Sequence, residues 1–87
     1  MAHHKSALKR IRQNAARRER NRHVKGTVRS AVKKVRSDIA ANDGESAKTD
    51  LAEAVRLLNR AAGKGIIPQK RASRLTSRLT KAVDSIE

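Results

Sequence analysis

The chain has 87 residues and contains no Phe, Tyr, Trp or Cys, so it forms one small domain whose core is built from Leu, Ile, Val and Ala. The missing aromatic residues exclude the stacking surfaces on which many RNA-binding and single-strand-binding folds hold bases, and the missing cysteines exclude disulfides and thiolate metal sites. A formal net charge of +14 indicates a polyanionic partner, and phosphate backbones are the commonest polyanions inside cells.

The positive charge is concentrated at the start of the chain. Thirteen of the first 36 residues are Lys or Arg and one, Glu19, is acidic, so this segment carries 12 of the 14 net charges. Apolar runs are two or three residues long, so we expect no membrane-spanning segment and no signal peptide. The first 36 residues are therefore the expected binding region.

The first predicted helix covers about residues 6–41. In its second half, apolar residues recur at spacings of three and four, which places them on one face of an α-helix. They are Val24, Val28, Ala31, Val32, Val35 and Ile39. The sequence Asn-Asp-Gly at residues 42–44 predicts the end of this helix and a turn.

The beginning of this helix has a different apolar face. At 100° per residue, Leu8, Ile11 and Ala15 point roughly 140° away from the later apolar face. We therefore expect residues 1–20 to project as a basic helical arm, called the arm below, beyond a three-helix bundle formed by residues 21–87.

The arm and the residues that join it to the bundle contain like charges one helical turn apart. Pairs such as Lys5 with Lys9 and Arg18 with Arg22 each destabilise an isolated helix by about 0.2–0.5 kcal/mol. Gly26, further along the same helix, lowers its stability by about 1 kcal/mol relative to Ala. We expect an arm that is frayed or disordered alone and becomes helical on its partner.

Two more helices are predicted at about residues 45–62 and 68–85. Asp43 or Ser46 is suited to cap the first of them, the sequence Gly-Lys-Gly at 63–65 ends it, and Pro68 is a favourable first residue for the next. Their apolar faces consist of Ala47, Leu51, Ala54, Val55, Leu58 and Ala61, and of Ala72, Leu75, Leu79, Val83 and Ile86. No segment alternates with a period of two, so the pattern predicts an all-α, antiparallel three-helix bundle.

The charges divide the helices into two kinds. The first and third helices each carry a row of basic residues and almost no acids; these rows are Arg22, Lys25, Arg29, Lys33 and Arg36, and Lys70, Arg71, Arg74, Arg78 and Lys81. Residues 37–63, in contrast, hold three basic and five acidic residues. Because ordinary solvated faces mix both signs, we expect the first and third helices to face an anionic ligand and the second to face solvent.

No group of residues indicates catalysis. The adjacent His3 and His4, the His23 and Glu19 pair and the Lys64-Gly65 turn lack the partners or spacing that metal, catalytic or phosphate-loop sites need. We expect no enzymatic activity, no metal and no cofactor.

Several stretches across nearly the whole chain are similar to one known family. They are Ala2 to Ala7, KRIRQ at 9–13, RRERNR at 17–22, VKGTVRSAVKKV at 24–35, AAGKGII at 61–67, and Ala72 and Arg74 with SRL at 77–79. Together they resemble the bacterial small-subunit ribosomal protein S20 family. The sequence Pro-Gln-Lys at 68–70 departs from the usual His-Lys-Asn run, although Lys70 and Arg71 keep the charge.

The resemblance implies a cytoplasmic ribosomal protein that binds 16S ribosomal RNA directly, supports assembly of the small subunit and has no catalytic activity. It implies a monomer within the particle, away from membranes, with neighbouring small-subunit proteins as further candidate partners. The RNA contacts that it implies are Lys5, Ser6, Lys9, Arg10, Arg12, Gln13, Arg17, Arg18, Asn21, Arg22, Lys25, Arg29, Arg74, Ser77 and Arg78. The basic rows described above add Lys33, Lys70 and Arg71 to the expected RNA-binding residues.

Two other classes fit parts of the pattern. A histone-like basic DNA-binding protein would share the charge but should prefer B-form duplex and dimerise. A membrane-active peptide or mitochondrial transit segment would share the Arg-rich start. However, Leu8 and Ile11 give a small apolar face without Trp or Phe, which is poor for anchoring at a membrane surface.

Overall fold

The computed structural model describes the backbone of residues 2–86 and the side chains of residues 5–86. It contains α1 (Ala2–Ala40), α2 (Gly44–Gly63) and α3 (Gln69–Asp84), and the described residues form no strand. The predicted all-α fold with a long first helix is confirmed. The first helix begins four residues earlier than the sequence indicated, at Ala2 instead of residue 6.

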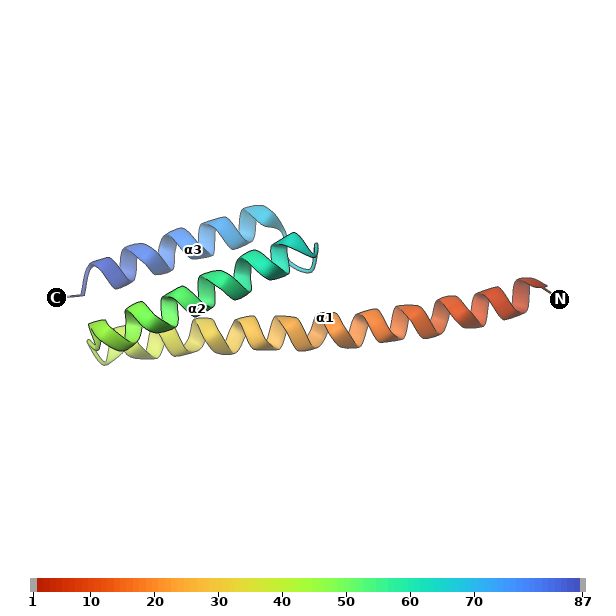
Figure 1. The fold of residues 1–87 in the computed structure, drawn as a ribbon, viewed down its shortest axis with the longest axis horizontal. Coiled ribbons are helices and arrows are strands. Elements are labelled where there is room, and N and C mark those ends of the chain that lie inside the picture. Colours follow the sequence, from red (N-terminus) through yellow and green to blue (C-terminus); the bar gives the residue numbers. More distant parts are fainter. Residues whose placement is uncertain (1, 87) are drawn as a thin grey trace.

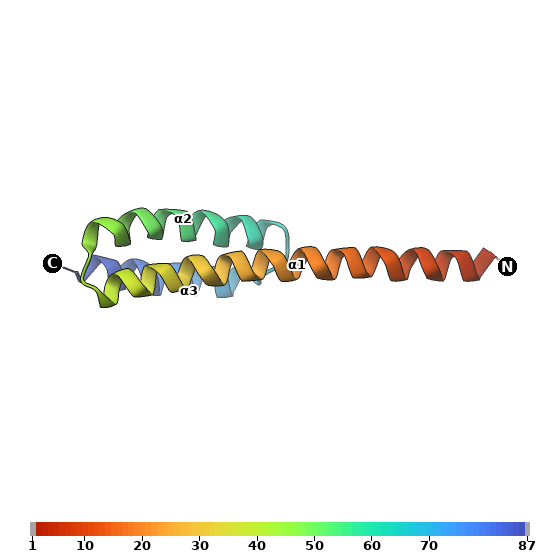
Figure 2. The same cartoon turned by 90° about the horizontal axis from the view of Figure 1, so that it is seen from below.

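Consecutive helices run antiparallel, and α2 packs on both α1 and α3 (Figure 1). Figure 2 shows α2 on one side of the bundle and α1 and α3 on the other. The first half of α1 continues past the bundle, so the molecule measures 67 Å along its longest axis but 21 and 14 Å across. The fold therefore combines a compact bundle with a free basic helix.

The core is aliphatic and draws on all three helices. Val35 and Leu58 are its largest fully buried side chains. The predicted apolar faces supply nearly all of it, since Val28, Val32, Ala54 and their helical neighbours are buried as expected. The exception is Ile66, which lies between α2 and α3 and is 8% exposed.

The turn between α1 and α2 combines the end of one helix with the cap of the next. Asn42 has a φ of 56°, and the N–H groups of Asn42 and Asp43 donate to the carbonyls of Ile39 and Asp38 at 3.0 Å. This is the Schellman pattern, in which an αL residue ends the helix. The Asp43 side chain then accepts a hydrogen bond from Ser46 N at 3.2 Å and caps α2. Gly44, expected in the turn, is instead the first residue of α2.

The turn between α2 and α3 uses the same pattern with glycine. Gly65 has a φ of 74°, and the N–H groups of Gly65 and Ile66 donate to the carbonyls of Ala62 and Ala61 at 3.0 Å. This turn directs Ile66 into the core, because the residue after the αL position commonly packs back on the helix that it ends. α3 begins at Gln69, one residue after the start that the sequence indicated, and Pro68 lies at its N-cap.

Candidate nucleic-acid interface

The arm is a continuation of α1 that no other helix covers. Every described side chain from Lys5 to Arg20 is exposed, including the apolar Leu8 at 44% and Ile11 at 63%. The first half-buried side chain after this stretch is Asn21, and Val24 is the first that packs against the core. The arm is helical in the structure, and the dependence of this helix on a bound partner remains a prediction.

The cations of the arm point in several directions around the helix. Arg10 lies about 100° around the helix axis from Lys9, and Arg12 lies about 200° from Arg10. One strip of the arm, formed by Leu8, Ile11, Ala15 and Glu19, carries no cation. The cations occupy most of the remaining circumference, so the arm is suited to a polyanion that contacts it on several sides. This differs from a helix that binds through one face.

Within the bundle, the cations of α1 and α3 form two defined faces. Arg22, Lys25, Arg29, Lys33 and Arg36 are all exposed and form the basic face of α1. They lie about 100° around the helix from the buried Val28, Val32 and Val35. The basic face of α3 consists of the exposed residues Lys70, Arg71, Arg74, Arg78 and Lys81. It begins at the end of the bundle from which the arm leaves (Figure 1).

None of the cations expected to bind RNA has a carboxylate partner among the described side chains. Two ion pairs are present in this part of the chain: Lys34 Nζ with Asp50 Oδ1 at 3.6 Å, and Arg56 with Glu53 on the same helix. Neither Lys34 nor Arg56 belongs to the expected RNA-binding set. The Arg56 guanidinium donates to the Glu53 carboxylate, and this interaction lowers the pKa of Glu53.

Of the expected contact residues, all are exposed except Asn21. Asn21 is half-buried, and its Oδ1 is buried without a hydrogen-bond partner among the described residues. The neutral Ser6, Gln13 and Ser77 are exposed beside the cations and could donate to phosphate or ribose oxygens. The structure thus leaves these side chains accessible, and their contacts with RNA remain predictions.

No site of another kind is found in the described part of the chain. Residues 2–86 contain no helix with the length and apolar character needed to cross a membrane. Within the described residues, no three His, Cys, Asp or Glu side chains come together as metal ligands would. His23 is exposed, and its carbonyl accepts a hydrogen bond from Thr27 Oγ1 at 3.0 Å. The side chains of His3 and His4 lie outside the described set.

The protein is a small aliphatic helical bundle with a free basic helix and with cations that lack carboxylate partners. These features define a class of small helical proteins that bind a polyphosphate. Comparison with known proteins gives the family. The family model for ribosomal protein S20 matches residues 2–84. "Small ribosomal subunit protein bS20" of Geotalea daltonii is 52% identical over 86 residues and covers 99% of both chains. The protein of the same name from Oleidesulfovibrio alaskensis is 47% identical over 87 residues and covers 100% of both chains.

The chain therefore belongs to the ribosomal protein S20 family. This confirms the resemblance that the arm and the second turn indicated. The relatives are structural ribosomal proteins, so the chain is not an enzyme, and as a ribosomal protein it is cytoplasmic.

Proposed function

We propose that this protein is a constituent of the small ribosomal subunit that binds 16S ribosomal RNA directly and supports assembly of the subunit. The arm and the basic faces of α1 and α3 are the binding surface. The observation that carries the proposal is the arm itself, which has 12 described side chains between Lys9 and Arg20, all exposed, of which six are cations and Glu19 is the one acid.

We expect the arm to be more stable when it is bound to a polyanion than when it is free. Its cations repel one another at spacings of one turn, and none is neutralised by a described carboxylate. Phosphate groups would remove this repulsion and release their own counterions, which drives binding. Arginine, which dominates the arm between Arg10 and Arg20, can hold a phosphate with two parallel hydrogen bonds or stack on a base.

The shape of the arm favours contact between RNA segments over insertion into one groove. An α-helix with side chains is about 10–12 Å wide, and the major groove of A-form RNA is too narrow and deep to be read by side chains. An arm with cations on several sides fits between neighbouring backbones. The basic faces of α1 and α3 would then hold further backbone segments beside the bundle.

The names of the relatives support the part of this proposal that concerns the small ribosomal subunit. They describe small ribosomal subunit proteins. We expect the protein to act as a monomer within the particle, with ribosomal RNA as its main partner and neighbouring small-subunit proteins as additional ones. Because binding would draw distant RNA segments to one bundle and one arm, it would favour their assembled arrangement.

Competition binding tests the proposal. The protein is titrated against a 16S ribosomal RNA transcript, transfer RNA and duplex DNA, each over a range of salt concentrations. We expect preference for the ribosomal transcript and a loss of about 10³–10⁵ in affinity between 50 and 200 mM salt, as for a protein that neutralises roughly six to ten phosphates. Equal affinity for the three nucleic acids would contradict specific recognition of ribosomal RNA. A preference for duplex DNA by a dimer would favour a histone-like protein instead.

A further inference from the structure

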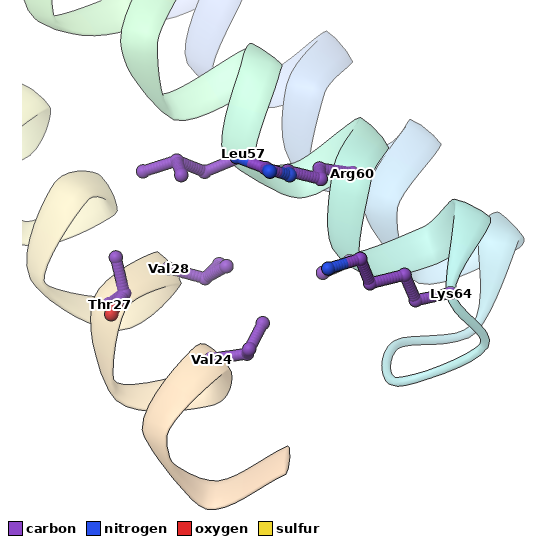
Figure 3. A pocket seen from close by; sticks show the side chains of 7 residues that line it. Val24, Thr27, Val28, Leu57, Arg60 and Lys64 are labelled. Atoms are coloured by element: carbon purple, nitrogen blue, oxygen red, sulfur yellow. The ribbon is translucent and has the colours of Figure 1, made fainter. Parts of the chain in front are cut away.

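A cavity lies where the arm joins the bundle. α1 and α2 are close at their connecting turn and diverge toward the arm (Figure 1). Between them is a cavity of about 180 Å³, with Val24 and Val28 of α1 on one side and Leu57 and Ala61 of α2 on the other. These small aliphatic side chains do not fill the space between the diverging helices. Figure 3 shows Val24 and Val28 facing α2 across it.

Two cations border this apolar space. Arg60 and Lys64 are one turn apart near the end of α2, and both are exposed and line the cavity. In Figure 3 the Lys64 side chain extends back toward the gap between the two helices. Cations at a helix C-terminus also stabilise the helix, which gives both residues a use within the bundle. Arg60 and Lys64 have a second use at the cavity, because they place positive charge beside its aliphatic wall.

The two cations are available for a ligand. Among the described side chains no carboxylate pairs with Arg60 or Lys64, whereas Arg56, one turn before Arg60, is paired with Glu53. The Thr27 hydroxyl, also at the cavity, already donates to the His23 carbonyl. The α1 side of the cavity therefore offers mainly carbon surface, and the α2 side offers charge.

The volume, the aliphatic wall and the charges of the cavity indicate the chemistry of its ligand. Cavities for drug-sized molecules have volumes of about 300–1,000 Å³, so this one has room for a single ring or side chain. The ligand must have an apolar face and carry negative charge close to it. One unpaired nucleotide has both: a base with two apolar faces, and a phosphate within one sugar of it.

We propose that the cavity holds the base of one unpaired nucleotide of the bound RNA, while Arg60 and Lys64 hold its phosphate. The inference rests on the proposed function and adds α2 to the RNA-binding surface. An acidic peptide would satisfy the same charges. The position of the cavity favours RNA, because Thr27 belongs both to the cavity and to a surface hollow at the base of the arm. That hollow is lined by Glu19, Arg22 and His23 among others. RNA that follows the arm would reach the cavity next.

Sequence reasoning did not indicate this site, because it assigned the second helix to solvent on the basis of its net acidic charge. The signal that was present is the pair Arg60 and Lys64 at a spacing of four, with no acid between them or in the following turn. The cavity itself depends on the divergence of α1 from α2, which no residue pattern shows.

The test combines a charge variant with two cavity-filling variants. Arg60→Gln with Lys64→Gln removes both cations. The matched control, Lys48→Gln with Arg56→Gln, removes one Lys and one Arg from exposed positions elsewhere on α2. Val24→Phe and, independently, Leu57→Phe place a ring in the cavity from half-buried positions. Circular dichroism and thermal unfolding identify which variants keep the fold.

Each variant is bound to a 16S ribosomal RNA transcript, and the reactivity of every nucleotide toward base-specific reagents is measured. We expect one unpaired nucleotide to be protected in the wild-type and control complexes and reactive in the test complexes. When one single-strand phosphate is no longer neutralised, the slope of log affinity against log salt also falls by about 0.7. The control should show a smaller change of slope.

The outcomes separate this inference from the proposed function. If the wild-type protein binds the transcript and every folded test variant keeps the same protection pattern and salt slope, the cavity site is wrong and RNA binding stands. If the wild-type protein does not bind the transcript, the proposed function fails as well. If the test variants keep their binding to RNA but no longer associate with another ribosomal protein, the occupant is a peptide and the inference is overturned.

Discussion

The Lys34 ammonium of α1 lies 3.6 Å from the Asp50 carboxylate of α2, and this is the one ion pair that joins two helices among the described side chains. Asp38, one turn after Lys34, adds a second carboxyl group at the same place, and its Oδ2 is buried without a hydrogen-bond partner among the described residues. The junction between α1 and α2 therefore contains two neighbouring carboxyl groups and one ammonium. Its charge balance depends on pH.

The pKa of Asp38 is raised above its ordinary value of 3.8. A protonated Asp38 carboxyl can donate a hydrogen bond to the nearby Asp50 carboxylate, which favours the protonated form. Burial and the charges of Asp50 and Asp43 act in the same direction, and Lys34 opposes them. In the pH range just above 3.8, the folded chain therefore binds more protons at Asp38 than the unfolded chain does. The protonated Asp38 carboxyl stabilises the folded state fully at pH values below the ordinary pKa. This stabilisation is lost as the pH rises through the raised pKa.

We predict that Asp38→Asn raises the melting temperature at pH 7, because the amide is neutral and can donate to Asp50. The difference from the wild-type protein should shrink as the pH falls through the raised pKa of Asp38, because the wild-type side chain then becomes neutral as well. Thermal unfolding at several pH values measures it. Asp84→Asn, an exposed position on α3, is the control and should change the melting temperature little. A lower melting temperature for Asp38→Asn at pH 7 would contradict the account.

The second prediction concerns repulsion at the point where the arm joins the bundle. Replacing Arg17, Arg18 and Arg22 by Ala should weaken binding to the 16S transcript and make the free protein more helical. Removing the repulsion between Arg18 and Arg22 gains about 0.2–0.5 kcal/mol, and alanine has the highest helix propensity. The salt slope should fall by about 0.7–0.9 for each phosphate that the variant no longer neutralises. Circular dichroism measures the helicity, and a decrease would show that these arginines stabilise the arm.

The elements of the fold follow from the sequence, whereas their relative placement does not. Apolar residues at helical spacing predicted all three helices, because burial requires each helix to turn one face toward the core. The left-handed position in the first turn falls on Asn42 instead of Gly44, since both residue types tolerate it and the sequence alone does not choose between them. Ile66 joins the core from a turn, where no periodicity can reveal it.

The same distinction holds for the candidate interface. Long cationic side chains without nearby acids are exposed in almost any fold, so the exposure of Arg17, Arg29 and Arg78 could be predicted. Contacts between helices could not be predicted from the sequence. The proximity of Asp38 and Asp50 depends on the register of α1 against α2. The cavity beside Arg60 depends on the angle between the same two helices.

The third prediction concerns the cap between α1 and α2. Asp43→Ala should destabilise the bundle by about 0.5–2 kcal/mol, because it leaves the Ser46 N–H without its acceptor at the start of α2. Asp43→Asn is the matched control, since asparagine caps helices about as well as aspartate while removing the charge. Chemical denaturation of the three proteins measures the difference. Equal destabilisation in both variants would show that the charge of Asp43 matters and its cap does not.

The final prediction concerns the independence of the arm and the bundle. Deleting residues 1–20 should lower the melting temperature by less than about 4 °C, because surface changes away from packed side chains alter stability by up to about 0.5 kcal/mol. The described side chains up to Arg20 are all exposed, so their removal leaves no unfilled space in the core. A deletion that continues through residue 28 is the comparison, because it also removes Val24 and the buried Val28 and should lower the melting temperature further.

The shorter deletion should still weaken binding to the 16S transcript and reduce its salt dependence, since it removes seven Lys and Arg residues. Weaker binding at unchanged stability would identify the arm as a ligand-binding extension of an independent bundle. A large fall in melting temperature from the shorter deletion would contradict this division, because it would mean that the arm packs against the bundle in solution.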